Sequence, residues 1–189
     1  TDLEEHFEKY ANWLIQNSYL TNGSKILDIG ANDGLFLSNF LDSGISCIGI
    51  DPSGITTIDS NISIIKSYMD EVGSEKLLNI SKEFDVITAN NVFSHQDNIS
   101  EMLEQITRFM GKSSWFVFEV SYLKSTIDNK VYDYIYHEHL SYHSITALVP
   151  FLKNHGLYIS DVKEINTKGG SIRVVTSKNK HLEDHFLKA

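Results

Sequence analysis

Apolar runs alternate with amphipathic segments along most of the chain. Five short runs rich in isoleucine, valine, leucine and phenylalanine have the composition of strands buried on both faces of a parallel sheet. They lie at 25–30, 46–51, 61–66, 84–90 and 114–120. Segments with helical spacing separate them, at 34–42, 53–59, 70–80 and 97–110. This alternation predicts an α/β domain in which helices cover both faces of a mostly parallel sheet.

Both ends of the chain extend this pattern. Apolar side chains recur near helical spacing over 2–19, which predicts an amphipathic helix packed on the core. Residues 144–155 also look helical, with Ser144 as the N-cap. Two further strands follow at 157–165 and 171–177, and the short link between them favours a hairpin. We therefore expect a seven-stranded sheet that ends in a C-terminal antiparallel hairpin.

These elements divide the chain into three parts. We expect residues 1–20 to form the N-terminal helix that packs on the core, 21–177 to form the main domain, and 178–189 to form a polar tail. A single domain of this size is ordinary for a globular protein. The chain is long enough to bury a core without disulfide or metal cross-links.

Composition narrows the class of protein. The chain has a net charge of −9 and no basic run, so it is poorly suited to bind nucleic acid or a membrane surface. No apolar run approaches the roughly 20 residues of a membrane span. Cys47 is the only cysteine, which excludes an intrachain disulfide or a Cys-rich zinc site within this chain. We expect a cytoplasmic enzyme or binding domain whose partner is a small molecule.

The sharpest local signal is the sequence DIGANDG at 28–34, between a predicted strand and a predicted helix. Gly30 permits a tight turn and close approach of a ligand, and Gly34 lets the helix begin near the loop. Asp28 lies at the carboxyl end of the first strand, where open α/β sheets bind ligands. Asp51 ends the second strand roughly 20 residues further on, where a carboxylate can accept two ribose hydroxyls.

The loop favours one nucleoside cofactor over others. It lacks the G-x-G-x-x-G pattern that cradles a pyrophosphate, whereas the Asp28 carboxylate suits an ammonium. S-adenosylmethionine combines an ammonium, a sulfonium and a ribose, so we predict it as the cofactor and S-adenosylhomocysteine as the product. The predicted contacts are Asp28, Gly30, Asn32, Gly34, Asp51, Asn90 and Asn91. Tyr68 and Met69 either stack on the adenine or belong to the core, and the alternative for the loop is a plain tight turn.

Residues 131–144, VYDYIYHEHLSYHS, are crowded with tyrosine and histidine and lack a clean period. His95 follows the fourth strand, so we expect it and this cluster to face the cofactor cleft. A histidine titrates near neutrality, so it suits the role of a general base. Tyrosine or histidine can donate a hydrogen bond to a developing negative charge on oxygen. Spacing alone does not choose between His137 and His139 as the base.

The same cluster permits a metal hypothesis. His137 and His139 share one face of an extended segment, and Glu138 and His95 could complete a transition-metal site. However, the order HEH lacks the helical spacing of HEXXH zinc enzymes, and nothing fixes the third ligand. We therefore predict no metal.

Six segments together resemble the class I S-adenosylmethionine-dependent methyltransferases, which implies a Rossmann-like methyltransferase fold. More narrowly, the chain is similar to sugar C-methyltransferases that act on nucleotide-linked 4-keto-deoxyhexoses. The matching pieces, in the family's order, are DIGANDGLFL (28–37), GIDPS (49–53), ANNVFSHQDN (89–98), FEVSYL (118–123), YDYIYHEHLSYHS (132–144) and TKGGSIRV (167–174). The first two are shared by many methyltransferases, whereas YHEHLSYHS and GGSIRV are specific to the narrower family.

This resemblance implies residue roles that spacing does not provide. His139 matches the general base of the family, and Tyr136 and Glu138 match active-site residues of the same motif. His95 matches the histidine placed near the reacting ketone. The implied reaction is C-methylation of a nucleotide-linked keto-deoxysugar, by His-assisted enolate formation and in-line methyl transfer.

A second glycine-containing turn is a candidate substrate contact. Gly169 and Gly170 can expose amides to a diphosphate, helped by Lys168 or Arg173. A plain hairpin turn explains the same residues equally well.

The chain departs from the family in two ways. Members usually begin with a small Cys-rich zinc domain and continue into a further C-terminal domain, and neither is found in this sequence. We therefore expect an excised catalytic domain or a shortened relative, with flanking domains as partners. The alternatives are an O- or N-methyltransferase acting on another small metabolite, or a cofactor-binding fragment that is inactive without its flanks.

Overall fold

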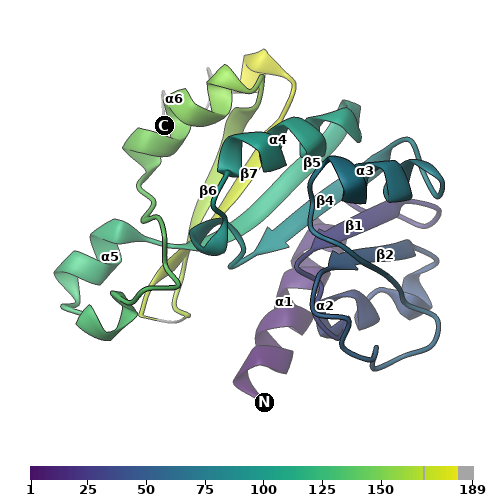
Figure 1. Ribbon diagram of the computed structural model, residues 1–189, viewed down its shortest axis with the longest axis horizontal. Coiled ribbons are helices and arrows are strands. Elements are labelled where there is room, and N and C mark those ends of the chain that lie inside the picture. The colour runs from purple at the N-terminus through teal and green to yellow at the C-terminus, as the bar shows by residue number, and fades with distance from the viewer. Residues whose placement is uncertain (168, 183–189) are drawn as a thin grey trace.

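Seven strands form one sheet in the order β3-β2-β1-β4-β5-β7-β6 (Figure 1). The computed structural model describes residues 1–167 and 169–182. The strands are β1 (Lys25–Ile29), β2 (Ser46–Asp51), β3 (Ser63–Lys66), β4 (Phe84–Asn90), β5 (Met110–Ser121), β6 (Tyr158–Ile165) and β7 (Ser171–Ser177). The first five pair in parallel, and β7 lies antiparallel between β5 and β6. The predicted fold class is therefore confirmed.

The strand order reverses at β1, because β2 and β3 lie on one side of it and β4 and β5 on the other. In open α/β sheets the connections on the two sides of such a point diverge and leave a crevice at the carboxyl ends of the strands. Asp28 and Asn90 stand near these ends of β1 and β4. The topology thus creates a ligand crevice at the sequence segments that carry the glycine loop.

Helices cover both faces of the sheet (Figure 1). The helices α1 (Asp2–Gln16) and α2 (Leu35–Ser38) lie on one face, and α3 (Glu71–Leu78), α4 (Ile99–Arg108) and α6 (Ile145–Asn154) lie on the other. Alternate strand residues supply the two cores: Ile26 packs with α1 and α2, whereas Leu27 packs with the opposite helices. No helix among the described residues has both the length and the apolar character that a membrane span requires.

Local capping explains where several helices begin. The side chains of Asp70, Asn98 and Ser144 each accept a backbone N–H in the first turn of the helix that follows. Thr1 and Glu4 form a capping box at the start of α1. Ser144 is the predicted N-cap.

Two predicted helices differ from the structure. Residues 53–59 form bends because Gly54 is left-handed (φ +67°), and Ile58 donates to the carbonyl of Asp33 so that the segment follows the glycine loop. The segment 34–42 forms only the short α2 and a 3-10 turn, Leu41–Ser43. Both connections are short, so tertiary contacts decide their path rather than helical propensity.

The tyrosine- and histidine-rich segment 122–143, which we call the excursion, leaves the sheet after β5 (Figure 1). It contains α5 (Leu123–Asp128) and a 3-10 turn, Tyr132–Tyr134. Its two ends meet, because the Leu123 amide donates to the carbonyl of His143 at 2.9 Å. The excursion is therefore a loop whose two ends are hydrogen-bonded together, and it lies beside the crevice at the carboxyl end of β5. The predicted polar tail 178–189 falls mostly outside the described residues, and the predicted domain limits stay predictions.

A buried charged cluster joins three elements at the carboxyl end of β5. Glu119, 1% exposed, accepts hydrogen bonds from Nε and Nη2 of Arg173 on β7 at 2.8 and 2.6 Å. His6 on α1 contacts the other carboxylate oxygen at 2.8 Å. The Arg173 guanidinium also lies 3.4 Å above the ring of Tyr10. Burial by itself raises the pKa of Glu119, but the His6 and Arg173 interactions outweigh it, so this pKa lies below its usual value.

We expect Arg173→Met to destabilise the fold by about 3–5 kcal/mol, because it leaves the buried Glu119 carboxylate without its main cation. Urea denaturation gives the free energy of unfolding. Lys163 is the matched control, since it lies opposite Arg173 in the β6–β7 ladder and is exposed. Lys163→Met should change stability by less than about 0.5 kcal/mol. Equal effects of the two substitutions would show that the cluster does not stabilise the packing of β5, β7 and α1.

Candidate active site

The glycine loop and α1 enclose a cavity of about 300 Å³ at the carboxyl ends of β1 and β4. Its lining includes five of the predicted cofactor-binding residues, Asp28, Gly30, Asn32, Asn90 and Asn91. Leu3 and Phe7 of α1 also line this cavity, which we call the cofactor cavity. Sequence reasoning missed these two side chains, because their helical spacing indicated packing alone.

Gly30 is required at the turn that shapes the cofactor cavity. It has φ +72°, and a Cβ atom there would lie 2.6 Å from a methyl of Val92. The next residues turn back toward β2, so that the Asn32 amide donates to the Asp51 carboxylate at 2.9 Å. Gly34 instead caps α2 and is absent from the cavity lining among the described residues.

Asp28 is a buried carboxyl group, 3% exposed, on the floor of the cofactor cavity. Its pKa is raised to about 7, mainly by burial and to a smaller extent by the nearby Asp51 carboxylate. A hydrogen bond from Thr88 lowers the pKa but does not cancel these effects. The Thr88 hydroxyl donates to Asp28 at 2.6 Å. The amide oxygen of Asn90 is buried without a hydrogen-bond partner among the described residues. A carboxylate beside an unsatisfied acceptor suits a ligand ammonium, because it donates to both groups.

Asp51 stands behind the loop rather than in the cavity lining. Its carboxylate accepts the amides of Asn32 and Ser53, at 2.9 and 2.8 Å. Tyr68 and Met69, the candidate adenine contacts, line a separate cavity of about 330 Å³ together with His95. Met69 is also part of the core, whereas Tyr68 is 61% exposed.

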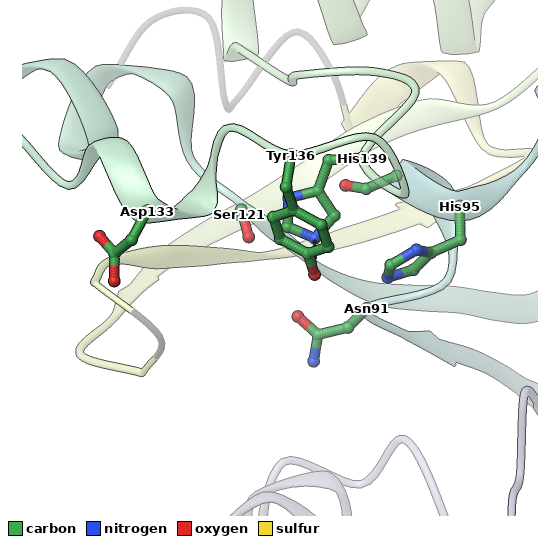
Figure 2. A pocket seen from close by; sticks show the side chains of 7 residues that line it. Asn91, His95, Ser121, Asp133, Tyr136 and His139 are labelled. Carbon is green, nitrogen blue, oxygen red and sulfur yellow. Dashed lines mark hydrogen bonds between the residues drawn. The ribbon is translucent and has the colours of Figure 1, made fainter.

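A second cavity, of about 350 Å³, lies between the sheet edge and the excursion (Figure 2). We call it the acceptor cavity. Its lining consists of Asn91, Ser94, His95, Ser121, Asp133, Tyr136 and His139. Asn91 and His95 also line the cofactor cavity, so the two cavities adjoin at these residues. Three of the four predicted catalytic side chains, His95, Tyr136 and His139, thus meet in one place.

The geometry around His139 is suited to proton transfer. The Tyr136 hydroxyl lies 3.0 Å from Nε2 of His139, and the ring centroids of these residues are 4.2 Å apart. The imidazoles of His95 and His139 meet edge to face, with centroids 5.0 Å apart. Both side chains come from segments that the sequence separates widely, and Leu140 joins those segments by donating to the Ser94 carbonyl at 2.7 Å.

Glu138 contacts the site through its backbone. Nδ1 of His95 lies 3.0 Å from the carbonyl oxygen of Glu138. A carbonyl only accepts, so Nδ1 carries the proton and Nε2 of neutral His95 is the free acceptor. The Glu138 side chain is exposed and is not among the described lining of either cavity. Glu138 therefore orients His95 in this structure, and a direct catalytic role for its carboxylate stays a prediction.

Asn91 has a left-handed backbone (φ +58°), which is uncommon for a residue with a side chain. The backbone amide of Asn91 donates to the backbone carbonyl of Glu119 at 2.8 Å. The buried cluster of Glu119, Arg173 and His6 thereby supports Asn91, one of the two residues that line both cavities. A non-glycine residue held in this conformation is typical of functional sites.

The predicted diphosphate contacts are not supported by their surroundings. Arg173 is 3% exposed and its guanidinium is bound to Glu119, so we withdraw its assignment to the substrate. The Gly170 amide donates to Thr167 within the turn, and a Cβ at Gly170 would lie 2.4 Å from that of Ser125. The carbonyl of Gly169 accepts from Asn129. The two glycines contact the excursion, and they also line a separate cavity of about 440 Å³, so their role as substrate contacts stays a prediction. Lys168 lies outside the described residues.

The remaining histidines of the cluster lie outside the acceptor cavity. His137 is exposed, whereas His143 is buried, and burial lowers the pKa of His143 to about 4. In the part of the chain that the structure describes, no group of three histidine, cysteine or acidic side chains is arranged to hold a metal. Sequence reasoning missed Ser94, Ser121 and Asp133, because they belong to no recognisable spacing.

A family model described as a methyltransferase domain matches residues 3–162. The chain belongs to this methyltransferase family. It is 29% identical to C-methyltransferase NovU of Streptomyces niveus, over 90% of this chain and 41% of NovU. It is 24% identical to a ubiquinone biosynthesis O-methyltransferase of Paraburkholderia phymatum, over 81% of this chain and 72% of that protein. The methyltransferase thus spans less than half the length of NovU.

Solved structures share the fold of this methyltransferase. An S-adenosylmethionine-dependent methyltransferase from Archaeoglobus fulgidus has a TM-score of 0.71 at 19% identity, over 93% of this chain and 94% of that one. The 1,6-didemethyltoxoflavin-N1-methyltransferase of Burkholderia thailandensis, solved with S-adenosylhomocysteine, has a TM-score of 0.69 at 14% identity. The match covers 92% of this chain and 79% of that one. The predicted class and its cofactor, S-adenosylmethionine, are therefore confirmed, whereas the individual residue roles stay predictions.

Asp28 should make stability depend on pH. Its pKa is raised in the folded state, from 3.8 to about 7, so the folded protein holds a proton that the unfolded chain loses. Its contribution to stability is therefore lost as the pH rises from about 4 to 7. In the variant Asp28→Asn the side chain at this position does not titrate. We expect the free energy of unfolding of this variant, relative to the wild type, to rise over that range and then level off.

Urea denaturation at several pH values, without cofactor, measures this difference. Asp161→Asn, which neutralises an exposed carboxylate on β6, is the control and should give a flat difference. A flat difference for Asp28→Asn as well would mean that its carboxyl group is ionised throughout.

Proposed function

We propose that this methyltransferase transfers a methyl group to a carbon atom of a nucleotide-linked keto-deoxysugar. The observation that carries the proposal is the junction of the two cavities at Asn91 and His95, with His139 and Tyr136 on the acceptor side. A methyl donor and an acceptor can then face each other across this junction. The likeness to C-methyltransferase NovU supports carbon as the methylated atom.

The cofactor cavity fits S-adenosylmethionine by the chemistry of its polar groups. Asp28 and the unsatisfied amide oxygen of Asn90 would bind the ammonium. Asp51 lies outside the cavity lining and holds the glycine loop through the Asn32 amide, so its predicted contact with the ribose is not part of this proposal. Gly30 would let the ligand approach the backbone closely. When bound, the cofactor supplies an electrophilic methyl group on a cationic sulfur, which leaves as a neutral thioether. Leu3 and Phe7 of α1 would exclude water from this side of the site.

His139 removes the proton from the carbon beside the ketone in the proposed reaction. The C–H electron pair becomes part of the enolate, and the proton moves to the imidazole. In the structure the Tyr136 hydroxyl is hydrogen-bonded to Nε2 of His139. The ketone oxygen would replace that nitrogen as the acceptor of the Tyr136 proton, so that tyrosine stabilises the growing negative charge. The enolate carbon would be the nucleophile for the methyl group that the cofactor supplies, with the methyl–sulfur bond breaking and its electron pair remaining on sulfur, and His139 would release its proton to water.

His95 orients the acceptor beside His139. The Glu138 carbonyl holds its Nδ1–H, which leaves Nε2 directed to other partners. His95 lines both cavities, and this supports a position near both reacting groups in the proposed complex. We therefore assign it to alignment of the acceptor ring against the methyl donor, which is the main contribution a protein makes to such a transfer.

O-methylation is the second candidate, and a specific observation favours it. The ubiquinone biosynthesis O-methyltransferase relative covers 81% of the chain. In that reaction His139 would deprotonate a hydroxyl, and no exchange of a carbon-bound proton would occur. A cofactor-binding fragment that needs flanking domains would bind S-adenosylhomocysteine but give no turnover with either acceptor.

We expect His139→Ala to lower the rate of methyl transfer by roughly 10²–10⁴-fold, because it removes the proton acceptor. Tyr136→Phe should lower it by roughly 10²-fold through loss of one donor to the enolate. Calorimetry should give nearly unchanged affinity for S-adenosylhomocysteine in both variants. His137→Ala is the control, since this exposed histidine lies two residues from the base and outside the described cavity lining.

Solvent deuterium exchange separates the two candidate reactions. Without methyl donor, the wild type should exchange the proton beside the ketone of a nucleotide-linked 4-keto-deoxyhexose, and His139→Ala should not. Methylation of an oxygen atom, with no such exchange, would contradict the C-methylation proposal and favour the second candidate.

The proposed role of Asp28 predicts pH-dependent binding of the cofactor product. An ammonium ligand favours the ionised carboxylate, and burial raises the pKa of Asp28 to about 7. The affinity for S-adenosylhomocysteine should therefore increase by about tenfold between pH 6 and pH 8. Calorimetry of Asp28→Asn should show weak binding without this increase. Asp33→Asn, in the same cavity lining, should retain it, and an unchanged pH profile in Asp28→Asn would refute the ammonium contact.

A further inference from the structure

The acceptor cavity has two chemically different ends. His95, His139 and Tyr136 supply the proton-transfer groups at one end (Figure 2). Asp133 lies at the side away from His95, and Ser121 lies between them (Figure 2). Among the described residues that line the cavity, Asp133 is the one acidic side chain, and none is lysine or arginine. The end beyond the proton-transfer groups is therefore rich in hydrogen-bond acceptors.

The fold holds this end of the cavity in place. Asp133 belongs to the 3-10 turn Tyr132–Tyr134, and the turn is preceded by a hydrogen bond of 3.0 Å from the Val131 amide to Thr126. A Cβ at Gly169 would lie 2.9 Å from a methyl of Val131, so the β6–β7 turn presses directly on this segment. Ser121 is the last residue of β5 and pairs with Ser171 on β7. Both polar groups thus rest on the same hairpin.

The charge of this end decides what part of an acceptor fits there. A diphosphate would be repelled by the Asp133 carboxylate, and the cavity lining offers no described lysine or arginine to offset the repulsion. A group that donates hydrogen bonds is attracted instead, because an ionised carboxylate only accepts. Asp133 is exposed and lines the acceptor cavity, which is the observation that makes it a candidate ligand contact.

We propose that Asp133, assisted by Ser121, is a specificity-determining residue that selects acceptors with a hydroxyl or ammonium group on the ring. This inference rests on the proposed function. In a nucleotide-linked 4-keto-pyranose, C1 carries the diphosphate, and C3 and C5 adjoin the ketone. C2 is the remaining ring carbon, and we assign its substituent to Asp133 while the ketone faces Tyr136 and His139. The two acceptors of the test carry the same group at C3, so only the contribution of the C2 group is compared.

The test compares two acceptors that differ at one atom. They are a nucleotide-linked 4-keto-6-deoxyhexose with a hydroxyl at C2 and its 2-deoxy counterpart. The wild type should prefer the hydroxyl compound in kcat/KM by about tenfold or more, because the deoxy compound leaves the carboxylate without a donor. Asp133→Ala should reduce this preference to about threefold or less, and Ser121→Ala should reduce it partly.

Matched variants separate a charge effect from a hydrogen bond. Asp133→Asn keeps an acceptor oxygen, so it should retain part of the preference for a hydroxyl and lose any preference for a C2 ammonium. Asp161→Asn changes the net charge equally on an exposed site of β6 and should leave every preference unchanged. Wild-type turnover with a preference that Asp133→Ala does not alter would overturn the inference.

Equilibrium binding distinguishes failure of this inference from failure of the proposed function. Calorimetry measures the affinity of both acceptors for the protein loaded with S-adenosylhomocysteine, which needs no turnover. If the wild type methylates neither compound but binds the hydroxyl form more tightly, and Asp133→Ala removes that difference, the binding site stands and the reaction is wrong. Equal affinities in the wild type would refute the role of Asp133 whatever the reaction.

Discussion

The arrangement of the site depends on the contacts of Glu119. Its carboxylate binds Arg173 on the antiparallel strand and His6 on the N-terminal helix. Its backbone carbonyl accepts a hydrogen bond from the backbone amide of Asn91. One buried residue thus joins β5 and β7, the helix that lines the cofactor cavity, and Asn91, which lines both cavities. Leaving such a carboxylate unpaired would be costly, because a buried charge needs its partners.

The acceptor side depends on a different set of contacts. The excursion carries Asp133, Tyr136 and His139, and it is attached where Tyr122 and Asn129 donate to the carbonyls of Gly170 and Gly169. The glycines allow the β6–β7 turn to approach without side chains in the way. Because the same hairpin also contributes Arg173, the two sides of the site share one support. A polar acceptor ring and a cationic cofactor can therefore be held in fixed relation.

The sequence predicted the sheet well, since buried strands depend on local pattern, and five of the predicted cofactor-binding residues lie in the lining of one cavity, while their roles stay predictions. Buried strands have a recognisable composition, and Asp28 and Gly30 belong to a loop whose chemistry follows from its position after a strand. The choice of His139 over His137 came from family resemblance, and the structure now places only His139 in the acceptor cavity lining. Residues 53–59 were predicted wrongly, because a weak helical pattern gave way to contacts with the glycine loop.

Other features could not be predicted because they depend on residues distant in the chain. Gly169 and Gly170 are equally compatible in sequence with a phosphate-binding turn and with tight packing, and only the folded structure shows that Ser125 and Val131 lie against them. Arg173 looks like a substrate ligand until its burial against Glu119 is seen. Asp133 has no periodic neighbours, so its place in the cavity appears only when the excursion is folded onto the sheet edge.

We propose that the cofactor and the acceptor occupy adjoining cavities that meet at Asn91 and His95. A crystal structure with both S-adenosylhomocysteine and a nucleotide-linked 4-keto-deoxyhexose would show whether they do. The homocysteine sulfur should lie beside Asn91 and His95 and face a ring carbon next to the ketone, and the His139 imidazole should lie against the hydrogen of that carbon. An acceptor bound outside the cavity that Tyr136 and His139 line, or a cofactor away from Asp28, would contradict it.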